Sequence, residues 1–352
     1  MTQRIGFACK YLDSDQTQTK KILDELQRPL VGRMTTVAWL NRQTVVDAEQ
    51  RLWDLMVHNI QSYYNLIKYV GSLPNELRMV RLGSEVLPVY TQPTWSYFWK
   101  RSDVQEHCER EFAKVGALAR DLDVRISMHP GQFVVLASDN PDIVDRSIAE
   151  FEYHTDCIRW MGYGVKFQDF KCNVHISGRC GPQGIKDALK RLSPEARNCI
   201  TIENDENKWG IADSLELEKD VALVLDVHHH LCRENEYILP TDDRFKRVVD
   251  SWRGVRPAIH YSYSRDSALP EGFAHDVMPD FTSLLEAGHK KGKLRAHSDW
   301  FPNAAVNDYA LSFLEHTDIM CEVKFKNLAS IELYNYAVKT GVIKVNTDDI
   351  TC

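Results

Sequence analysis

The chain contains two short apolar runs that each end in a carboxylate or beside one, ITIEN at residues 200–204 and ALVLD at residues 222–226. Runs of this length, rich in Ile, Val and Leu, are typical of strands buried on both faces of a parallel sheet. Six more runs of the same kind occur at residues 4–8, 79–83, 125–129, 172–176, 257–261 and 319–323. We therefore predict eight buried strands.

Amphipathic segments separate most of these runs, and those at residues 44–70, 105–122 and 141–161 have apolar residues at helical spacing. Strand and helix alternating eight times predict an α/β fold, a (β/α)8 TIM barrel formed by one domain over residues 1–352. Periodicity alone does not exclude an open doubly wound sheet. Two long βα connections, at residues 9–78 and 262–318, are expected at the catalytic face, where the strands end.

The composition narrows the functional classes. With 43% apolar and 26% charged residues, the chain is neither disordered nor a coiled coil. No apolar run approaches the roughly 18 residues of a membrane span, and the N-terminal MTQRIGFA lacks the order of a secretion signal, so we expect a cytoplasmic, nucleoid-associated protein. The nine cysteines form no C-x-x-C pair, which argues against a disulfide framework and a thiolate zinc site.

The net charge of −7 is the opposite of what a simple DNA-coating protein carries. Three bound divalent cations would neutralise most of it, so the charge by itself does not decide the partner.

Ionisable side chains gather where the predicted strands end. Six runs end in, or next to, a histidine or a carboxylate: His129, His175, Glu203, Asp226, His260 and Glu322. His229 follows Asp226 by three residues, and His297 lies in the last long connection. Because the C-terminal ends of all strands of a parallel barrel point to one mouth, we expect these eight groups to converge.

Eight such groups in one place predict a metal site. Without a cation they would leave buried charge unpaired, at a cost of several kcal/mol. Glu203 is a natural bridging ligand because a carboxylate has two oxygens, and the closely spaced Asp226 and His229 suit Mn²⁺ or Zn²⁺.

Several motifs, in one order, resemble the UV damage endonuclease family of the UvdE type. They are SMHPGQF (127–133), VHISGRCG (174–181), IENDENKW (202–209), LDVHHH (225–230), IHYS (259–262), RAHSDW (295–300) and EVK (322–324). The resemblance implies a TIM barrel related to endonuclease-IV-like nucleases, with up to three divalent ions, Mn²⁺ foremost and Zn²⁺ or Mg²⁺ as alternatives.

For function, the resemblance implies nicking of damaged double-stranded DNA immediately 5′ of cyclobutane dimers and 6-4 photoproducts, and of abasic sites as a further substrate. The products are a 3′-hydroxyl and a 5′-phosphate, and the nick initiates excision repair. No obligatory protein partner is evident.

The resemblance also implies roles for individual residues. His129, His175 and Glu203 match the ligands of one metal; Glu203, Asp226, His260 and Glu322 match the second; His229 and His297, with Asp226, match the third. Glu203, His229 and His260 are the expected catalytic residues. The DNA-facing residues are expected to be the lesion-probing Gln132 and Phe133, then Phe7, Tyr11, Arg179, Lys208 and Arg295.

This chain departs from the family pattern at several positions. Gln92 stands where members often have a ligating histidine, and Ala258 replaces a lysine two residues before His260. Phe7 and Tyr11 replace a common Tyr and Asn. The connection at residues 262–294 is also longer than expected, and it is expected either to extend the DNA-facing rim or to contact a partner.

Two other interpretations remain open from the sequence. A sugar isomerase or epimerase on the same barrel also places carboxylates and histidines at strand ends, although five histidines favour the three-metal nuclease. A lesion-binding protein that has lost cleavage is the second.

Overall fold

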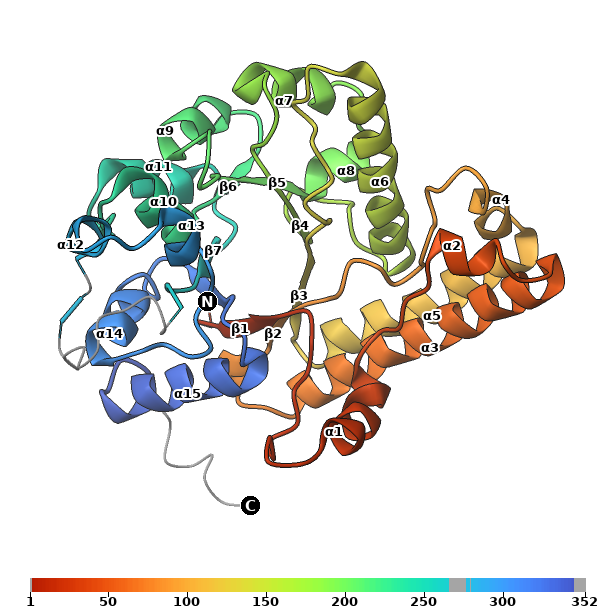
Figure 1. Cartoon of the computed structure of the whole chain (residues 1–352), viewed down its shortest axis with the longest axis horizontal. Helices are drawn as coiled ribbons and strands as arrows, with labels where there is room; N and C mark the ends of the chain where they lie inside the picture. Colours follow the sequence, from red (N-terminus) through yellow and green to blue (C-terminus); the bar gives the residue numbers. More distant parts are fainter. Residues whose placement is uncertain (1, 266–276, 279, 345–352) are drawn as a thin grey trace.

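The computed structural model describes residues 2–265, 277–278 and 280–344, and a ring of parallel strands lies at its centre (Figure 1). The strands are β1 (Ile5–Ala8), β2 (Met79–Arg81), β3 (Arg125–Met128), β4 (Lys171–His175), β5 (Ile200–Glu203), β6 (Ala222–Val224), β7 (Ala258–Tyr261) and β8 (Asp318–Cys321). They pair in the order β6-β5-β4-β3-β2-β1-β8-β7, and a parallel bridge between Asp226 and His260 joins the two ends of the sheet. The predicted TIM barrel is confirmed, with strand ends within two residues of those expected.

The strands present different side chains to the barrel interior and to the helices outside. Side chains two residues apart share a face, so Lys171, Asn173 and His175 of β4 all point inward. The alternate residues, Cys172 and Val174, belong to the large apolar core between strands and helices. The interior of the barrel toward the C-terminal ends of the strands is therefore polar, although the strand sequences are largely apolar.

The end of the barrel at which the strands begin, called here the lower end, is closed by charged groups around Asp318, the first residue of β8. One carboxylate oxygen accepts from Arg125 at 2.6 Å, and the other accepts from Arg256 at 2.6 Å and from the backbone N–H of Arg4 at 2.9 Å. This network stands at the N-terminal ends of the strands, the end that stabilises a barrel and leaves the other end for chemistry.

Fifteen α-helices occur in the described residues. They are α1 (Lys20–Gln27), α2 (Val37–Leu40), α3 (Val45–Gly71), α4 (Ser96–Trp99), α5 (Ser102–Asp121), α6 (Pro141–Trp160), α7 (Gly181–Leu189), α8 (Pro194–Cys199), α9 (Ile211–Ser214), α10 (Val227–Glu234), α11 (Asp243–Asp250), α12 (Phe281–Glu286), α13 (Lys291–Leu294), α14 (Ala304–Ser312) and α15 (Lys326–Lys339). Short 3-10 turns occupy Arg28–Leu30, Asn75–Leu77 and Leu215–Leu217. The three predicted helices correspond to α3, α5 and α6.

Helix α3 is the longest element. Thr44 caps it by accepting from the backbone N–H of Asp47 at 3.1 Å, and its 27 residues span about 40 Å. Figure 1 shows α3 and α5 lying side by side and extending well beyond the strand ring.

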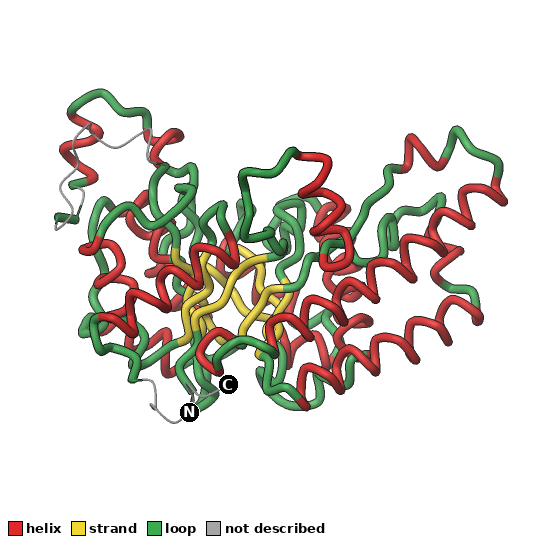
Figure 2. Tube along the Cα trace, turned by 90° about the horizontal axis from the view of Figure 1, so that it is seen from below, coloured by secondary structure: helices red, strands yellow, loops and turns green. Residues whose placement is uncertain are grey.

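Both long connections carry helices. Residues 9–78 contain α1, α2 and α3, and residues 262–318 contain α12, α13 and α14. Figure 2 shows the strands edge-on, with helices around them. Part of the 262–294 connection, residues 266–276 and 279, lies outside the described residues.

Across the described part of the chain, no helix combines the length and apolar character needed to cross a bilayer. Cysteines of the described residues are free thiols.

Candidate metal centre

The register of neighbouring strands brings the strand-end residues together. His175 of β4 is paired directly with Glu203 of β5, and Asp226 is bridged to His260 of β7. Two groups result in which the possible ligand atoms all lie within 4.8 Å of one another: His129, His175 and Glu203; and Glu203, Asp226 and His260. Glu203 belongs to both groups, which is the arrangement of a carboxylate that bridges two ions.

The imidazole of His129 is oriented by its own loop. Its Nδ1 lies 2.8 Å from the carbonyl oxygen of Pro130, which only accepts, so Nδ1 carries the proton. Burial lowers the pKa of His129 to about 3, so the ring is neutral. Its Nε2 lone pair then faces a carboxylate oxygen of Glu203 at 3.4 Å. Two electron-pair donors that face each other are stabilised by a cation between them.

Asp226 and His229 are joined by the start of α10. Asp226 caps this helix and accepts from the backbone N–H of His229 at 2.7 Å. The three-residue spacing between them is thus the first turn of a helix. The ring Nδ1 of His229 donates to the carbonyl of Asn204 at 3.0 Å, which turns Nε2 toward Asp226 Oδ2 at 3.8 Å.

The interior of the barrel fixes Glu203. Asn173 donates to Glu203 Oε2, and Thr201 in turn donates to the Asn173 amide oxygen at 2.7 Å. Because Thr201 engages that oxygen, the amide nitrogen must face Glu203. Such support from behind a ligand sets its orientation, and its loss typically costs about 10- to 100-fold in metal affinity.

His260 lies between two carboxylates and an amine. Its Nδ1 is 3.1 Å from Glu203 Oε1 and 3.0 Å from Glu322 Oε1, and its Nε2 is 2.7 Å from the Lys171 amine. Burial lowers the pKa of Lys171 to about 7. The Lys171 amine thus contacts the His260 imidazole at Nε2, on the side opposite the two carboxylates.

Glu322 is paired with Arg81 of β2. Although burial raises the pKa of this carboxyl group, the Arg81 guanidinium holds it well below its usual value. His297 lies nearby, with Nδ1 donating to the Glu322 carbonyl at 2.6 Å. His297 is not part of either three-residue group found in the described residues.

The residues present fit a divalent cation. Asp226 is fully buried, its Oδ2 has no hydrogen-bond partner among the described residues, and burial raises the pKa of its carboxyl group well above the usual value. Burial also disfavours the charged form of His229, but Asp226, Glu203 and Glu206 raise the pKa of this ring to about 9. The carboxylates thus demand positive charge, and mixed imidazole and carboxylate donors suit Mn²⁺ and Zn²⁺.

Comparison with known proteins identifies the family of the chain. A family model described as UV-endonuclease UvdE matches residues 4–350. The chain belongs to the UvdE family of UV-endonucleases. It is therefore a DNA-cleaving enzyme.

Individual relatives of the UvdE family cover most of the chain. The UV DNA damage endonuclease of Bacillus cereus is 22% identical over 320 residues, covering 86% of this chain and 89% of its own. That of Bacillus mycoides is 24% identical over 317 residues, covering 85% and 87%. The crystal structure of SacUVDE matches with a TM-score of 0.70 at 20% identity, covering 97% of this chain and all of that one, and supports the barrel fold.

The residues expected to face DNA differ in how exposed they are. Gln132 and Phe133 are exposed in the loop after β3, and Phe133 is 85% exposed. Arg179 and Lys208 are exposed, and the Lys208 amine donates to the Arg179 carbonyl at 3.4 Å. Arg295 is half-buried and donates to Asn207.

Phe7 requires a correction. The side chain is 1% exposed and belongs to the apolar core between strands and helices. The next residue, Ala8, packs with Met79 and Met320 instead. Because side chains alternate along β1, Phe7 points away from the barrel interior, and the expected contact with DNA is not available to it. Tyr11 is half-buried against Tyr69, at 4.8 Å between ring centroids.

The two departures from the UvdE pattern at Gln92 and Ala258 lie in different surroundings, one exposed and one buried. Gln92 lies in an exposed turn before α4, with its carbonyl accepting from Trp95 and Ser96. Ala258 is buried in β7, two residues before His260. The amine of Lys171 contacts His260 from β4, so a buried lysine is present at this ring even though position 258 lacks one.

Sequence reasoning missed Lys171, Asn173 and the pairing of Arg81 with Glu322. A signal for the first two was present, since polar residues at 171, 173 and 175 alternate with apolar ones and end in a predicted ligand. A strand expected to begin at residue 172 left Lys171 outside it. The partner of Arg81 depends on β2 and β8 lying on either side of β1 in the sheet, which no local pattern encodes.

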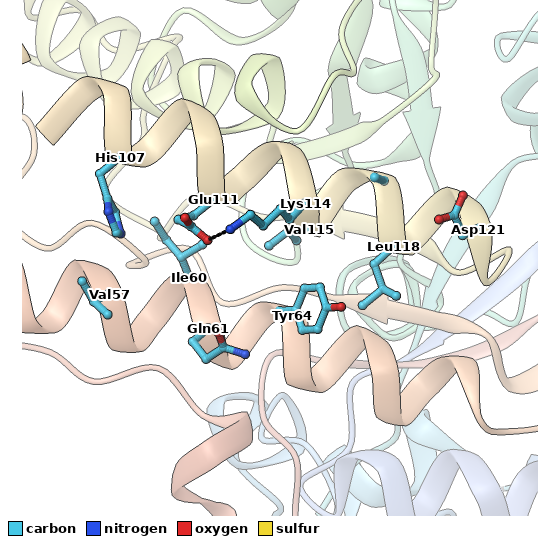
Figure 3. A pocket seen from close by; sticks show the side chains of 11 residues that line it. Val57, Ile60, Gln61, Tyr64, His107, Glu111, Lys114, Val115, Leu118 and Asp121 are labelled. Carbon is cyan, nitrogen blue, oxygen red and sulfur yellow. Dashed lines mark hydrogen bonds and ion pairs between the residues drawn. The ribbon is translucent and has the colours of Figure 1, made fainter. Parts of the chain in front are cut away.

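A groove between α3 and α5 lies apart from this centre (Figure 3). All of its lining residues come from those two helices, among them Tyr64, Leu118 and the Glu111–Lys114 ion pair of 2.7 Å. None of the predicted site residues lines it.

Proposed function

We propose that this protein is a metal-dependent UV damage endonuclease. It hydrolyses the phosphodiester immediately 5′ of cyclobutane dimers and 6-4 photoproducts, and of abasic sites as a further substrate. The products are a 3′-hydroxyl and a 5′-phosphate, and the nick initiates excision repair of cytoplasmic, nucleoid DNA. Up to three divalent ions, Mn²⁺ foremost, take part, and residues 1–352 act as one catalytic unit without a second protein.

One observation carries the proposal. Electron-pair donors of His129 Nε2, Glu203 Oε2 and Asp226 Oδ2 point into the barrel mouth, and the last of these has no hydrogen-bond donor among the described residues. Buried acceptors in such a cluster are stable when a cation lies between them.

The reaction needs an activated water and a stabilised leaving oxygen, and it needs no protein nucleophile. Divalent cations held by the eight groups would lower the pKa of a bound water and neutralise charge on the phosphate and the departing O3′. The chain's own part is to position them. Glu203 is held by Asn173, His129 by Pro130, and His229 by Asn204. Glu203, His229 and His260 are the side chains proposed to act at the reacting group.

Recognition of the lesion is proposed to depend on Phe133 and on basic residues at the mouth. An exposed Phe is unfavourable in water, and burying it is worth about 1.5–3 kcal/mol. Insertion into a weakened base stack would recover this energy, as apolar wedges do in bent DNA. Photoproducts stack and pair poorly, so opening the duplex costs less there. Arg179, Lys208 and Arg295 are proposed to contact phosphates.

Glu203→Gln tests the proposal because Gln keeps the size of the side chain but cannot bridge two ions. We expect nicking of UV-irradiated plasmid with Mn²⁺ to fall at least about a hundredfold, together with a loss of bound Mn²⁺. The matched control is Glu216→Gln, the same change at an exposed position in the Leu215–Leu217 turn. Undiminished nicking by the Glu203 variant, or full activity of the native enzyme in excess chelator, would contradict the metal mechanism.

Membership of the UV-endonuclease family argues against the two alternatives that the sequence left open, a sugar epimerase and a lesion-binding protein without cleavage. Retention of irradiated duplex without strand breaks under any divalent metal would contradict the proposal.

A further inference from the structure

We propose that Glu206 is a ligand of the third cation, together with Asp226 and His229. The inference rests on the proposed metal-dependent function and adds a residue that the family motifs did not assign. Glu206 lies beyond the end of β5, within the IENDENKW motif, and its side chain is 24% exposed.

The position of one carboxylate oxygen leads to this assignment. Glu206 Oε2 lies 3.7 Å from His229 Nε2, and Asp226 Oδ2 lies 3.8 Å from the same nitrogen. Two ligands of one ion, each 2.0–2.2 Å from it, are separated by about 3 to 4.4 Å. Both pairs fall in that range. Because Nδ1 of His229 donates to Asn204, Nε2 is the nitrogen that remains for a cation.

Asp226 supplies the independent observation. It is completely buried, and its Oδ2 lacks a hydrogen-bond partner among the residues that the structure describes. Its other oxygen, Oδ1, is used in capping α10. An unpartnered carboxylate oxygen that faces an imidazole nitrogen calls for a cation rather than for further packing.

Hydrogen bonds within the loop orient the side chain of Glu206. Asp205 accepts from the backbone N–H groups of Asn207 and Lys208, both at 2.7 Å, which sets a tight turn. The Asn207 amide donates to Glu206 Oε1 at 2.9 Å, and this leaves Oε2 toward His229. Arg295 donates to the Asn207 side-chain oxygen and so fixes the amide in that orientation.

Cation binding is the direct test, because it does not depend on cleavage. Metal-free protein is titrated with Mn²⁺, and the EPR signal of free Mn²⁺ gives the number of bound ions and their dissociation constants. We expect three ions for the native chain. For Glu206→Gln we expect two sites with unchanged affinity and a third weakened at least about tenfold. Glu206→Asp, which keeps the charge but draws the carboxylate back, should also weaken the third site.

Glu216→Gln is the matched control and should bind three ions as the native chain does. Circular dichroism of the metal-free variants checks that each is folded. Three sites of native affinity in Glu206→Gln, or only two sites in the native chain, would overturn the inference and leave the proposed endonuclease intact. Absence of any Mn²⁺ binding by the native chain would overturn both.

Discussion

Lys171 offers a test of the electrostatics inside the barrel. Its amine is buried and lies 2.7 Å from His260 Nε2. Lys171→Met removes the amine and keeps an unbranched side chain in β4. In the metal-free protein we expect the difference in unfolding free energy, variant minus native, to depend on pH.

The sign follows from the direction of the shift. Burial lowers the pKa of Lys171 from 10.5 to about 7 in the folded protein, so the unfolded chain binds this proton more tightly. The native protein is therefore penalised fully below pH 7 and gains stability as pH rises through 7 toward 10.5. At 1.36 kcal/mol per pKa unit, and with Lys171 half-titrated at pH 7, the gain between pH 7 and 9 is about 2 kcal/mol. Lys171→Met has no amine to titrate at this position, so it lacks this pH-dependent gain in stability.

Urea unfolding in excess chelator at pH 6, 7, 8 and 9 measures the difference in unfolding free energy between Lys171→Met and the native chain. The advantage of Lys171→Met over the native chain should be nearly constant from pH 6 to 7 and then shrink by about 2 kcal/mol by pH 9. Lys190→Met, which removes an amine from an exposed side chain, is the matched control. A difference that does not change with pH would refute the reasoning, since it would mean that the folded protein holds Lys171 as readily charged as the unfolded chain does.

Two further predictions concern the ends of the barrel. Asp318→Ala removes the shared acceptor of Arg125, Arg256 and the Arg4 backbone, and should lower the free energy of unfolding by about 3–5 kcal/mol because buried charges lose their partner. Asp123→Asn removes the charge of a carboxylate that pairs with Arg4 and is 69% exposed, and Asn tolerates the left-handed backbone there, so it should change the free energy of unfolding by less than about 1 kcal/mol. Equal losses in the two variants would show that the network around Asp318 is not stabilising. Phe133→Ala should reduce nicking of irradiated DNA at least about tenfold while changing unfolding by less than about 0.5 kcal/mol, as chemical denaturation and a plasmid assay would show. Native rates on irradiated DNA would remove Phe133 from lesion recognition.

Much of the site followed from the fold alone. Once the strands are parallel and closed into a ring, residues at their C-terminal ends must share one mouth, whichever strands carry them. His175, Glu203, Asp226 and His260 were predicted to converge for this reason, and the register brings them within ligand distance. The predicted convergence needed no knowledge of side-chain rotamers.

Other parts of the site could not be predicted in this way. Phe7 and Ala8 are neighbours in sequence, and only the pleat of β1 decides which of them enters the core beside the helices. Lys171 begins its strand like an ordinary exposed charge, yet it meets His260 from the other side of the ring. Glu206 depends on a turn whose hydrogen bonds involve Asp205 and Asn207.

The amino-acid sequence by itself determined the eight strands, the order of strand and helix, and the gathering of imidazoles and carboxylates at one end, because these depend on periodicity along the chain. The tertiary structure alone decided which donor faces which acceptor across the barrel: the lysine against His260, the arginine against Glu322, and the unpartnered oxygen of Asp226. Those contacts join strands far apart in the chain, and their distances depend on how the ring closes, a property that no local stretch of residues contains.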